Sequence, residues 1–393
     1  MELIEVITSK DNLNRAYKKV VANKGASGVD GITVEELGAY IRENKDTIVH
    51  SLRNRTYMPK PVRRVYIPKS NGKKRPLGIP TALEYLNDGY EWVIDIDIEQ
   101  FFDKVNHDKL IQVLREQVKD STTLNLIRKY LKAGVMENGL EKATKTGVPQ
   151  GGPLSVICSN VYLDKLDKEL EQRALRFVRY ADDILIFTKS ELAANRVMKS
   201  ISDWLERKLF LKVNATKTKV VKPTRSKYLG FTFLKYGGEW KVKPTTEKKK
   251  ALKQKLSEYL KRNRAVARPL AVTIKRVNEI VRGWINYFRI GMMKQFMEEF
   301  GAWLRHKIRV IVIKQWKTPK TIYKNLSYLN RKYGNGFKHE DIFKVANSRL
   351  GWYRKSGMNV VNFIISPELL ENRIKDGAGL LNPLNYYQRN VGI

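Results

Sequence analysis

The sequence has few of the residues that build disulfides and zinc sites. Among its 393 residues there is one cysteine, Cys158, and there are four histidines. A single cysteine excludes an internal disulfide and any zinc site made from several cysteines. So few histidines also argue against a zinc nuclease module. The histidines are His50, His107, His306 and His339.

Long apolar runs are missing as well. No run reaches the roughly 18 residues that indicate a membrane span, and the first residues lack the apolar core of a signal peptide. Together with the single cysteine, this predicts a protein that works without a membrane, in a reducing cytoplasm.

Acidic residues are the scarcer charged class, with 40 Asp and Glu against 75 Lys and Arg, so the net charge is +35. Such an excess predicts a polyanionic partner, with nucleic acid as the first candidate. The charge is uneven: residues 81–110 hold eight acids and two lysines, and residues 241–276 hold thirteen basic residues and two glutamates. The acidic segment suits a metal site that faces phosphates, and chance clustering on a solvated face is the alternative.

Two adjacent acids, Asp182 and Asp183, lie between apolar segments within Arg176–Phe187. Neighbouring side chains of a strand point to opposite faces, so the pair fits best on a tight turn between two strands. Two like charges held close together are costly unless a cation neutralises them. A divalent metal ion is the natural cation, and an ordinary surface turn is the alternative.

The alternating run Trp92–Ile98 predicts a second strand with acids. Asp95 and Asp97 are two residues apart, so they share one face of it. Aspartate is a poor strand former, and metal binding explains the two acids better than chance does. A turn rich in glycine and proline, Gly147–Ser155, leads into a predicted helix, Val156–Arg173. Its flexible backbone could approach a nucleotide closely, or it could be a plain loop and cap.

The remaining patterns predict a mixed α and β region followed by a helical one. Helices are expected over most of 10–55 and over 82–89, 108–134 and 192–209, and strands beside a basic hairpin turn at Asn71–Gly72 and at Lys227–Phe233. This order favours an α+β fold with a sheet covered by helices. From about residue 246 the chain is helical and basic with interspersed aromatics, and we expect most tryptophans in the core and most Lys and Arg toward nucleic acid.

The combination of an aspartate-bearing strand, a Gly-Pro turn and a doubly acidic hairpin suits two-metal phosphoryl transfer. These segments resemble the sequence blocks of reverse transcriptases, and two C-terminal segments look like the thumb and maturase region of group II intron-encoded proteins. The matching blocks, in the order of the family, are Lys73–Pro80, Ile94–His107, Gly147–Ser155, Tyr180–Asp183, Lys227–Phe231, Arg282–Phe288 and Trp316–Pro319.

The resemblance implies roles for individual residues. The three catalytic, metal-binding aspartates would be Asp97, Asp182 and Asp183, holding two Mg²⁺ ions. Asp95 would be structural. The nucleotide site would use Arg75, Lys69 as a less certain partner, Phe102 beneath the incoming sugar, and Gln150 with Gly151 beside the nascent base pair.

The resemblance also implies an architecture and a function. The fold would be a right-hand polymerase: an N-terminal extension and fingers (1–81), a palm with an antiparallel sheet (82–235), a helical thumb or X domain (236–330) and its helical extension (331–393). The protein would be an RNA-directed DNA polymerase and maturase that serves retrotransposition. Its partners would be group II intron RNA, an RNA template with a DNA primer, dNTPs and a DNA target site, in a bacterial cytoplasm as a ribonucleoprotein or on the nucleoid.

Two departures from the family pattern leave alternatives open. A long fingers segment expected after Thr81 is missing, through natural loss, design or omission from this sequence. No Cys/His nuclease domain is expected, so the intron RNA or another protein would cut DNA. The short fingers favour an RNA-binding splicing cofactor with weak or lost polymerase activity, whereas the three retained aspartates favour a polymerase. The two C-terminal blocks argue against a reverse transcriptase of defence systems or retrons.

Overall fold

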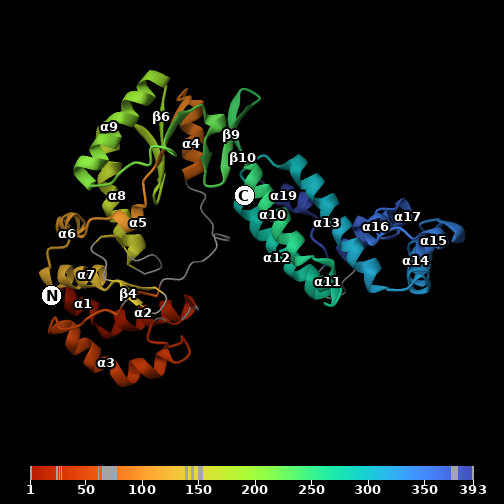
Figure 1. The fold of residues 1–393 in the computed structure, drawn as a ribbon, viewed down its shortest axis with the longest axis horizontal. Helices are drawn as coiled ribbons and strands as arrows, with labels where there is room; N and C mark the ends of the chain where they lie inside the picture. The colour runs from red at the N-terminus through yellow and green to blue at the C-terminus, as the bar shows by residue number, and fades with distance from the viewer. Residues whose placement is uncertain are drawn as a thin grey trace. The chain divides into compact units, whose positions relative to one another are not determined.

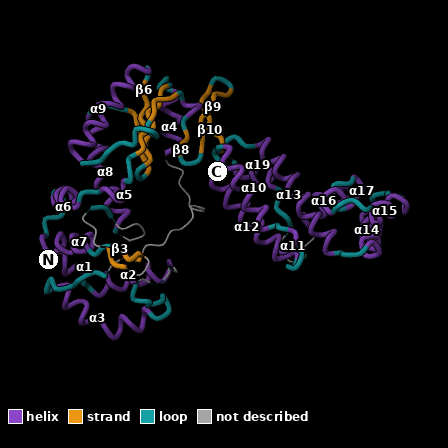
Figure 2. Tube along the Cα trace, viewed as in Figure 1, coloured by secondary structure: helices purple, strands orange, loops and turns teal. Residues whose placement is uncertain are grey.

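The computed structural model describes residues 2–23, 25, 27, 29–60, 62–63, 78–137, 140–142, 146–148, 154–372 and 379–391. The chain forms two compact units. The first comprises Met1–Ser70 with Glu84–Lys222, and the second comprises Asn71–Leu83 with Pro223–Ile393. Figures 1 and 2 trace the elements of both units. Among the described residues, no helix is both long and apolar enough to cross a membrane.

A four-stranded antiparallel sheet is the centre of the first unit. Its strands lie in the order β5 (Arg176–Tyr180), β6 (Asp183–Thr188), β2 (Trp92–Asp97) and β7 (Lys219–Val221). The register places Asp97 opposite Asp183, and Asp95 between Leu185 and Lys219. The predicted acidic strand and the predicted acidic hairpin are therefore neighbours in one sheet.

One face of this sheet carries the core of the unit. Ile94 and Ile96 of β2 lie beside Ile186 and Ile184 of β6, and all four side chains are buried. Helices α8 (Ser155–Gln172) and α9 (Glu191–Leu209) pack on the sheet, contributing Leu166 and Leu205 among others to the same core (Figure 1). Each buried aliphatic side chain contributes roughly 1.5–3 kcal/mol. The predicted α+β arrangement is confirmed, and both helices start and end within one residue of their predicted bounds.

The opposite face of the sheet changes character along its length. At one end, Val93, Leu185 and Phe187 are buried, and Tyr85 from the end of α4 (Gly78–Asn87) packs edge-on against Phe187 with ring centroids 5.7 Å apart. At the other end, the same face presents Asp97 and Asp183. Leu185 is the last buried apolar residue on this face before Asp183. The end of the face that carries Asp97 and Asp183 is partly exposed.

The rest of the first unit consists of helices and a small sheet. The sheet has the order β1-β3-β4, with β1 parallel to β3 and β3 antiparallel to β4. These elements are α1 (Leu3–Ile7), α2 (Lys10–Asn23), α3 (Leu37–Arg53), β1 (Val62–Arg63), α5 (Phe101–Lys104), α6 (His107–Arg115), α7 (Ser121–Lys132), β3 (Val135–Glu137) and β4 (Leu140–Lys142). The expected helix over 108–134 is two helices, because Asp120 caps a new one by accepting from the backbone N–H groups of Thr122 and Thr123.

The second unit begins with a three-stranded antiparallel sheet, ordered β10-β9-β8, and continues in helices. The elements are η1 (Pro223–Arg225), β8 (Lys227–Tyr228), β9 (Phe231–Tyr236), β10 (Glu239–Pro244), α10 (Thr246–Tyr259), α11 (Arg262–Ala265), α12 (Leu270–Phe288), α13 (Lys294–Gln315), α14 (Pro319–Tyr333), α15 (His339–Asn347), α16 (Trp352–Ser356), α17 (Asn359–Ile364), α18 (Pro367–Asn372) and α19 (Pro383–Asn390).

The expectation that most tryptophans lie in the core is met in part, since Trp240 is buried and the other tryptophans of this unit are partly buried. On α12, Phe288 lies between Phe231 of β9 and Trp284, with centroid distances of 5.0 Å and 4.5 Å. The Tyr287 hydroxyl donates to the carbonyl of Leu229 at 2.9 Å. The segment Arg282–Phe288 therefore joins α12 to the sheet, and its aromatics are not a free stacking surface.

Two further sequence predictions need correction. The strand expected over Lys227–Phe233 is a hairpin of β8 and β9, because Leu229 and Gly230 both adopt positive φ, 51° and 83°, and form a two-residue turn. Helix α4 begins at Gly78, four residues before its predicted start. Pro80 is tolerated in the first helical turn because proline lacks an N–H group, and N–H groups of that turn have no acceptor within the helix. The basic hairpin at Asn71–Gly72 lies outside the described residues.

Candidate functional site

The acidic hairpin forms as predicted, but only one of its two acids lies in the turn. Tyr180 and Asp183 pair across β5 and β6, so Ala181 and Asp182 form the two-residue loop. Ala181 has a φ of 55°, a left-handed conformation that costs a residue with a Cβ roughly 1–2 kcal/mol. Asp182 is therefore carried on a strained turn, and Asp183 is the first residue of the strand that follows. Strained backbone of this kind is concentrated at functional sites.

An arginine that sequence reasoning missed holds this turn in place. Arg179 of β5 binds the carboxylate of Asp167 on α8 with two nitrogen atoms, the Nε contact being 2.7 Å long. The same guanidinium donates to the carbonyl oxygen of Ala181 at 3.0 Å. Because bidentate Arg–carboxylate pairs are directional, the turn is tied to α8 as well as to its own strands. A charged residue on the core-facing side of a strand was the available sequence signal.

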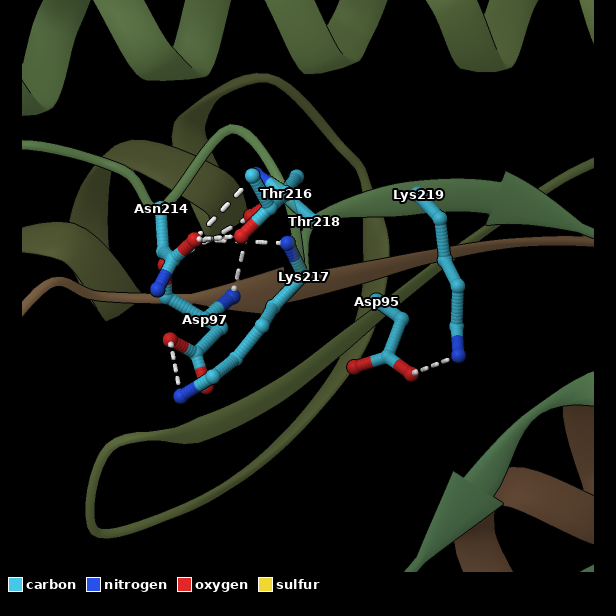
Figure 3. A network of polar contacts seen from close by, with 7 residues as sticks. All are labelled: Asp95, Asp97, Asn214, Thr216, Lys217, Thr218 and Lys219. Atoms are coloured by element: carbon cyan, nitrogen blue, oxygen red, sulfur yellow. Dashed lines mark hydrogen bonds and ion pairs between the residues drawn. The ribbon is translucent and has the colours of Figure 1, made fainter.

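Asp97 ends β2 directly opposite Asp183. Directly opposed residues have Cβ atoms about 5 Å apart and project from the same face. The Lys217 ammonium lies 3.4 Å from the Asp97 carboxylate (Figure 3). The backbone N–H of Asp97 donates to the Thr218 hydroxyl at 3.1 Å. Two carboxylates therefore share one end of the sheet, and a cation already neutralises part of their charge.

The position of Lys217 depends on a turn that starts at Asn214. The Asn214 side-chain oxygen accepts from the backbone N–H groups of Thr216 and Lys217, at 3.1 Å and 3.3 Å (Figure 3). The Asn214 backbone N–H donates to the Asp97 carbonyl at 2.8 Å. Sequence reasoning assigned no function to Lys217. The turn-forming asparagine three residues before it was a usable signal, because such side chains bond to backbone a few residues on.

Asp95 differs from Asp97 although both lie on the same face. Its side chain is 18% exposed against 38% for Asp97, and its carboxylate is 3.8 Å from the Lys219 ammonium (Figure 3). Burial raises the pKa of the Asp95 carboxyl, and the charge of Lys219 partly offsets that effect. The covered position fits the structural role that the sequence indicated for Asp95.

The start of the glycine-rich turn is fixed against the segment that follows β2. The N–H groups of Gly147 and Val148 donate to the carbonyls of Val105 and Phe102, both at 2.7 Å. Gly147 has a φ of 92°, and a Cβ there would lie 2.8 Å from the Phe102 carbonyl oxygen. Only glycine permits this close approach. The contacts join the turn to Phe102, so two predicted site segments meet.

A buried histidine supports the same junction. The Nε2 atom of His107 is 2.7 Å from the Gly147 carbonyl oxygen. Burial lowers the pKa of His107, which favours the neutral ring, and the hydrogen bond to Gly147 offsets this in part. A neutral imidazole can donate to a carbonyl through Nε2 while it remains uncharged in the core. The sequence placed His107 within a motif but assigned it no contact.

The described residues bring together part of the predicted site. Asp97, Asp182 and Asp183 lie at one end of the sheet, but no group of three Asp, Glu, His or Cys side chains in the described part of the chain is close enough to hold a metal ion. The donors nevertheless suit a hard divalent ion, and the Lys217 ammonium shows that a cation is accommodated beside Asp97. The predicted nucleotide-binding residues Lys69, Arg75, Gln150 and Gly151 lie outside the described residues.

Two family models match consecutive parts of the chain. Residues 68–233 match the model described as reverse transcriptase (RNA-dependent DNA polymerase). Residues 249–329 match the model described as group II intron, maturase-specific domain. The first match contains the acidic sheet, and the second contains α12 and α13. The chain therefore carries a reverse transcriptase domain followed by a maturase-specific domain.

Two curated proteins are similar to this chain. The group II intron-encoded protein LtrA of Lactococcus lactis subsp. cremoris is 33% identical over 205 residues, which cover 42% of this chain and 34% of LtrA. Protein YkfC of Escherichia coli (strain K12) is 29% identical over 299 residues, covering 56% of this chain and 78% of YkfC. The match thus spans about a third of the length of the intron-encoded relative.

Among solved structures, the apo telomerase from Candida tropicalis has a TM-score of 0.37 and 13% sequence identity to this chain. The similarity covers 93% of this chain and 62% of the telomerase. At this TM-score the similarity supports no functional conclusion.

Proposed function

This chain is a homologue of the group II intron-encoded reverse transcriptase/maturases, and on that premise we propose that it copies RNA into DNA and assists the splicing of a group II intron. The observation that carries the polymerase part is the register of the first sheet, which opposes Asp97 and Asp183 beside the hairpin that bears Asp182. The proposed partners are intron RNA, an RNA template with a DNA primer, dNTPs and a DNA target site.

Reverse transcription requires divalent metal ions, and we propose two Mg²⁺ ions held by Asp97, Asp182 and Asp183. When bound, the ions would activate a primer 3′-hydroxyl and stabilise the leaving pyrophosphate. Other residues of the chain position these groups. Arg179 fixes the hairpin, and the Asn214 turn places Lys217 beside Asp97. Lys217 keeps the acidic pair partly neutral, which lowers the cost of opposing two like charges.

Further residues complete the proposed site. Phe102 would pack beneath the incoming sugar, and its backbone already holds the turn at Val148. Arg75 and Lys69 would bind the triphosphate, and Gln150 with Gly151 would lie beside the nascent base pair. The proposed domains are fingers over 1–81, palm over 82–235, thumb or X domain over 236–330 and its extension over 331–393.

A second candidate function is an RNA-binding splicing cofactor with weak or lost polymerase activity. It is favoured because helix α4 leads into β2 with only residues 88–91 between them, where the family pattern has a long fingers segment. Retention of the three aspartates favours the polymerase instead, since RNA binding alone has no need of opposed carboxylates at a sheet end.

Primer extension on an RNA template with Mg²⁺ tests the proposal. We expect the unaltered chain to extend the primer, and the double variant Asp182→Ala, Asp183→Ala to lose extension while it retains RNA binding. Glu99→Gln is the matched control, because Glu99 is exposed and lies two residues beyond Asp97. Equal extension by the double variant would refute the polymerase. Rescue of intron splicing without any extension by the unaltered chain would establish the splicing cofactor.

A further inference from the structure

The second unit contains a cavity of about 540 Å³ between α13, α17 and the start of α18. We call it the Arg309 cavity. The residues of its lining that matter below are Arg305, His306, Arg309, Asn362, Phe363 and Glu368. Helices α13 and α17 are labelled in Figure 1. Its volume lies within the roughly 300–1,000 Å³ of small-ligand sites, so one nucleotide unit would fit.

In the part of the chain that the structure describes, Arg309 is a buried cation without a carboxylate partner. The residue as a whole is only 7% exposed. Nε donates to the Ile365 carbonyl at 2.8 Å and one terminal nitrogen donates to the Asn362 carbonyl at 3.3 Å. Burial, with the charge of Arg305 as a smaller cause, lowers the pKa of Arg309 to about 10. Within the described chain no carboxylate forms an ion pair with this guanidinium, whose remaining N–H groups are available to an anion in the cavity.

The other charges around the cavity are basic on balance. Arg305, one helical turn from Arg309, lines the same wall. Burial lowers the pKa of His306 on that wall, so its ring is mainly neutral at pH 7. Glu368 lies exposed at the start of α18. Two arginines against one exposed glutamate leave a positive cavity, and a buried guanidinium is costly until an anion pairs with it.

Exposed aromatic rings lie beside these arginines. Phe363, on the cavity lining, is 64% exposed. Tyr353 is also exposed and contacts the His306 ring, with centroids 4.1 Å apart. The Phe363 ring lies 6.1 Å from the Phe337 ring, centroid to centroid, and its exposed aromatic face beside arginines can stack an unpaired base.

We propose that the Arg309 cavity binds one unstacked nucleotide of a structured RNA. Arg305 and Arg309 bind its phosphate, and Phe363 stacks on its base. This inference rests on the proposed function, which makes intron RNA the partner. Arg305 and Arg309 lie within the maturase-specific match, and Phe363 lies beyond its end, so the site joins that domain to the segment that follows it.

The test compares two short RNA hairpins that differ only by a one-nucleotide bulge, with binding to the full chain followed by fluorescence anisotropy. We expect tighter binding of the bulged RNA. Phe363→Ala and Arg305→Gln, both at sites that are not fully buried, should each reduce that preference about tenfold, because the first removes the stacking ring and the second removes a phosphate contact. The matched controls are Phe343→Ala, 53% exposed, and Arg331→Gln, also exposed.

The outcomes separate the alternatives. Equal weakening of both RNAs by the cavity variants, or no change in preference, would overturn the proposal. The same preference for a bulged DNA hairpin would overturn the assignment to RNA. Unaltered protein that extends a primer but binds both RNAs equally would refute the cavity and leave the proposed function. Unaltered protein that prefers the bulged RNA but extends no primer would support the Arg309 cavity and refute the proposed polymerase activity.

Discussion

The acidic end of the first sheet and the Arg309 cavity each contain side chains of like charge, but they differ in whether residues of opposite charge lie beside them. Asp97 has the Lys217 ammonium at 3.4 Å, and Asp95 has Lys219 at 3.8 Å. Arg309 has only carbonyl oxygens as partners among the described residues. The acidic end is therefore partly neutralised by its own chain, whereas the cavity retains an unpaired guanidinium that suits a ligand anion.

The two sites also arise from different levels of structure. The acids lie on neighbouring strands whose register places them together, and the second of these strands is carried by its own hairpin. The cavity joins residues of α13 to residues of α17 and α18, more than fifty positions later in the chain. Local pattern can therefore indicate the acidic site, while the cavity depends on how helices pack.

The largest expected effect compares two aspartates of one strand. Asp97→Asn should lower primer extension by about 10³-fold or more, because it removes a carboxylate at the open end of the face where metal ions are proposed. Asp95→Asn should keep extension within about threefold and change stability little, since burial already disfavours that charge. Single-turnover extension and urea unfolding measure the two effects. Similar losses of primer extension in both variants would show that the covered Asp95 and the open Asp97 do not differ in function.

A smaller effect compares the buried arginines of the two units. Arg179→Met should reduce the free energy of unfolding by about 1–3 kcal/mol, because it leaves the half-buried Asp167 carboxylate without its partner. Arg309→Met should lie within about 1 kcal/mol of the unaltered protein, because loss of a buried charge offsets two lost hydrogen bonds. Urea denaturation followed by circular dichroism measures both. A larger loss from Arg309→Met would mean that its charge is compensated in the free protein.

The smallest effect concerns the buried histidine of the first unit. Burial lowers the pKa of His107 below its ordinary value of 6.5. Below about pH 6.5 the unfolded chain binds a proton at His107 that the folded chain does not bind. The contribution of the neutral His107 to the free energy of unfolding is therefore fully present above about pH 6.5 and is lost as the pH falls below that value. His107→Gln should reduce this acid-side loss, because glutamine can donate to Gly147 without titrating. Urea midpoints above and below that pH measure it, and an unchanged pH dependence would refute the assignment.

Much of the acidic site was predictable from residue patterns. Alternation placed Asp95 and Asp97 on one face, and the adjacent acids between apolar runs predicted a tight turn at Asp182 and Asp183, which the structure places one residue earlier, at Ala181 and Asp182. The supporting contacts were not predictable. Arg179 reaches Asp167 of another helix, and Lys217 reaches Asp97 from a loop 120 positions away. Such pairings depend on packing between elements, which the period of a pattern does not encode.

Errors in the predicted elements have the same origin. The hairpin at Leu229 and Gly230 was missed because a leucine in the left-handed region is unfavourable locally, and the pairing of β8 and β9 with the contact from Tyr287 outweighs that cost. For the aromatics of α12 the sequence left an RNA-contacting surface and a packed face as alternatives, and the structure favours packing, with Phe288 buried and Trp284 and Tyr287 partly buried.

The sequence by itself determined the excess of positive charge, the two segments that carry the aspartates and the order of the two domains. Only the tertiary structure decided which charges are neutralised. Lys217 lies against Asp97, and Arg309 lies buried in the cavity that Phe363 also lines, with no carboxylate paired to it among the described residues. The physical reason is that charges interact strongly over a few ångströms, and such distances between residues far apart in the chain are set by packing.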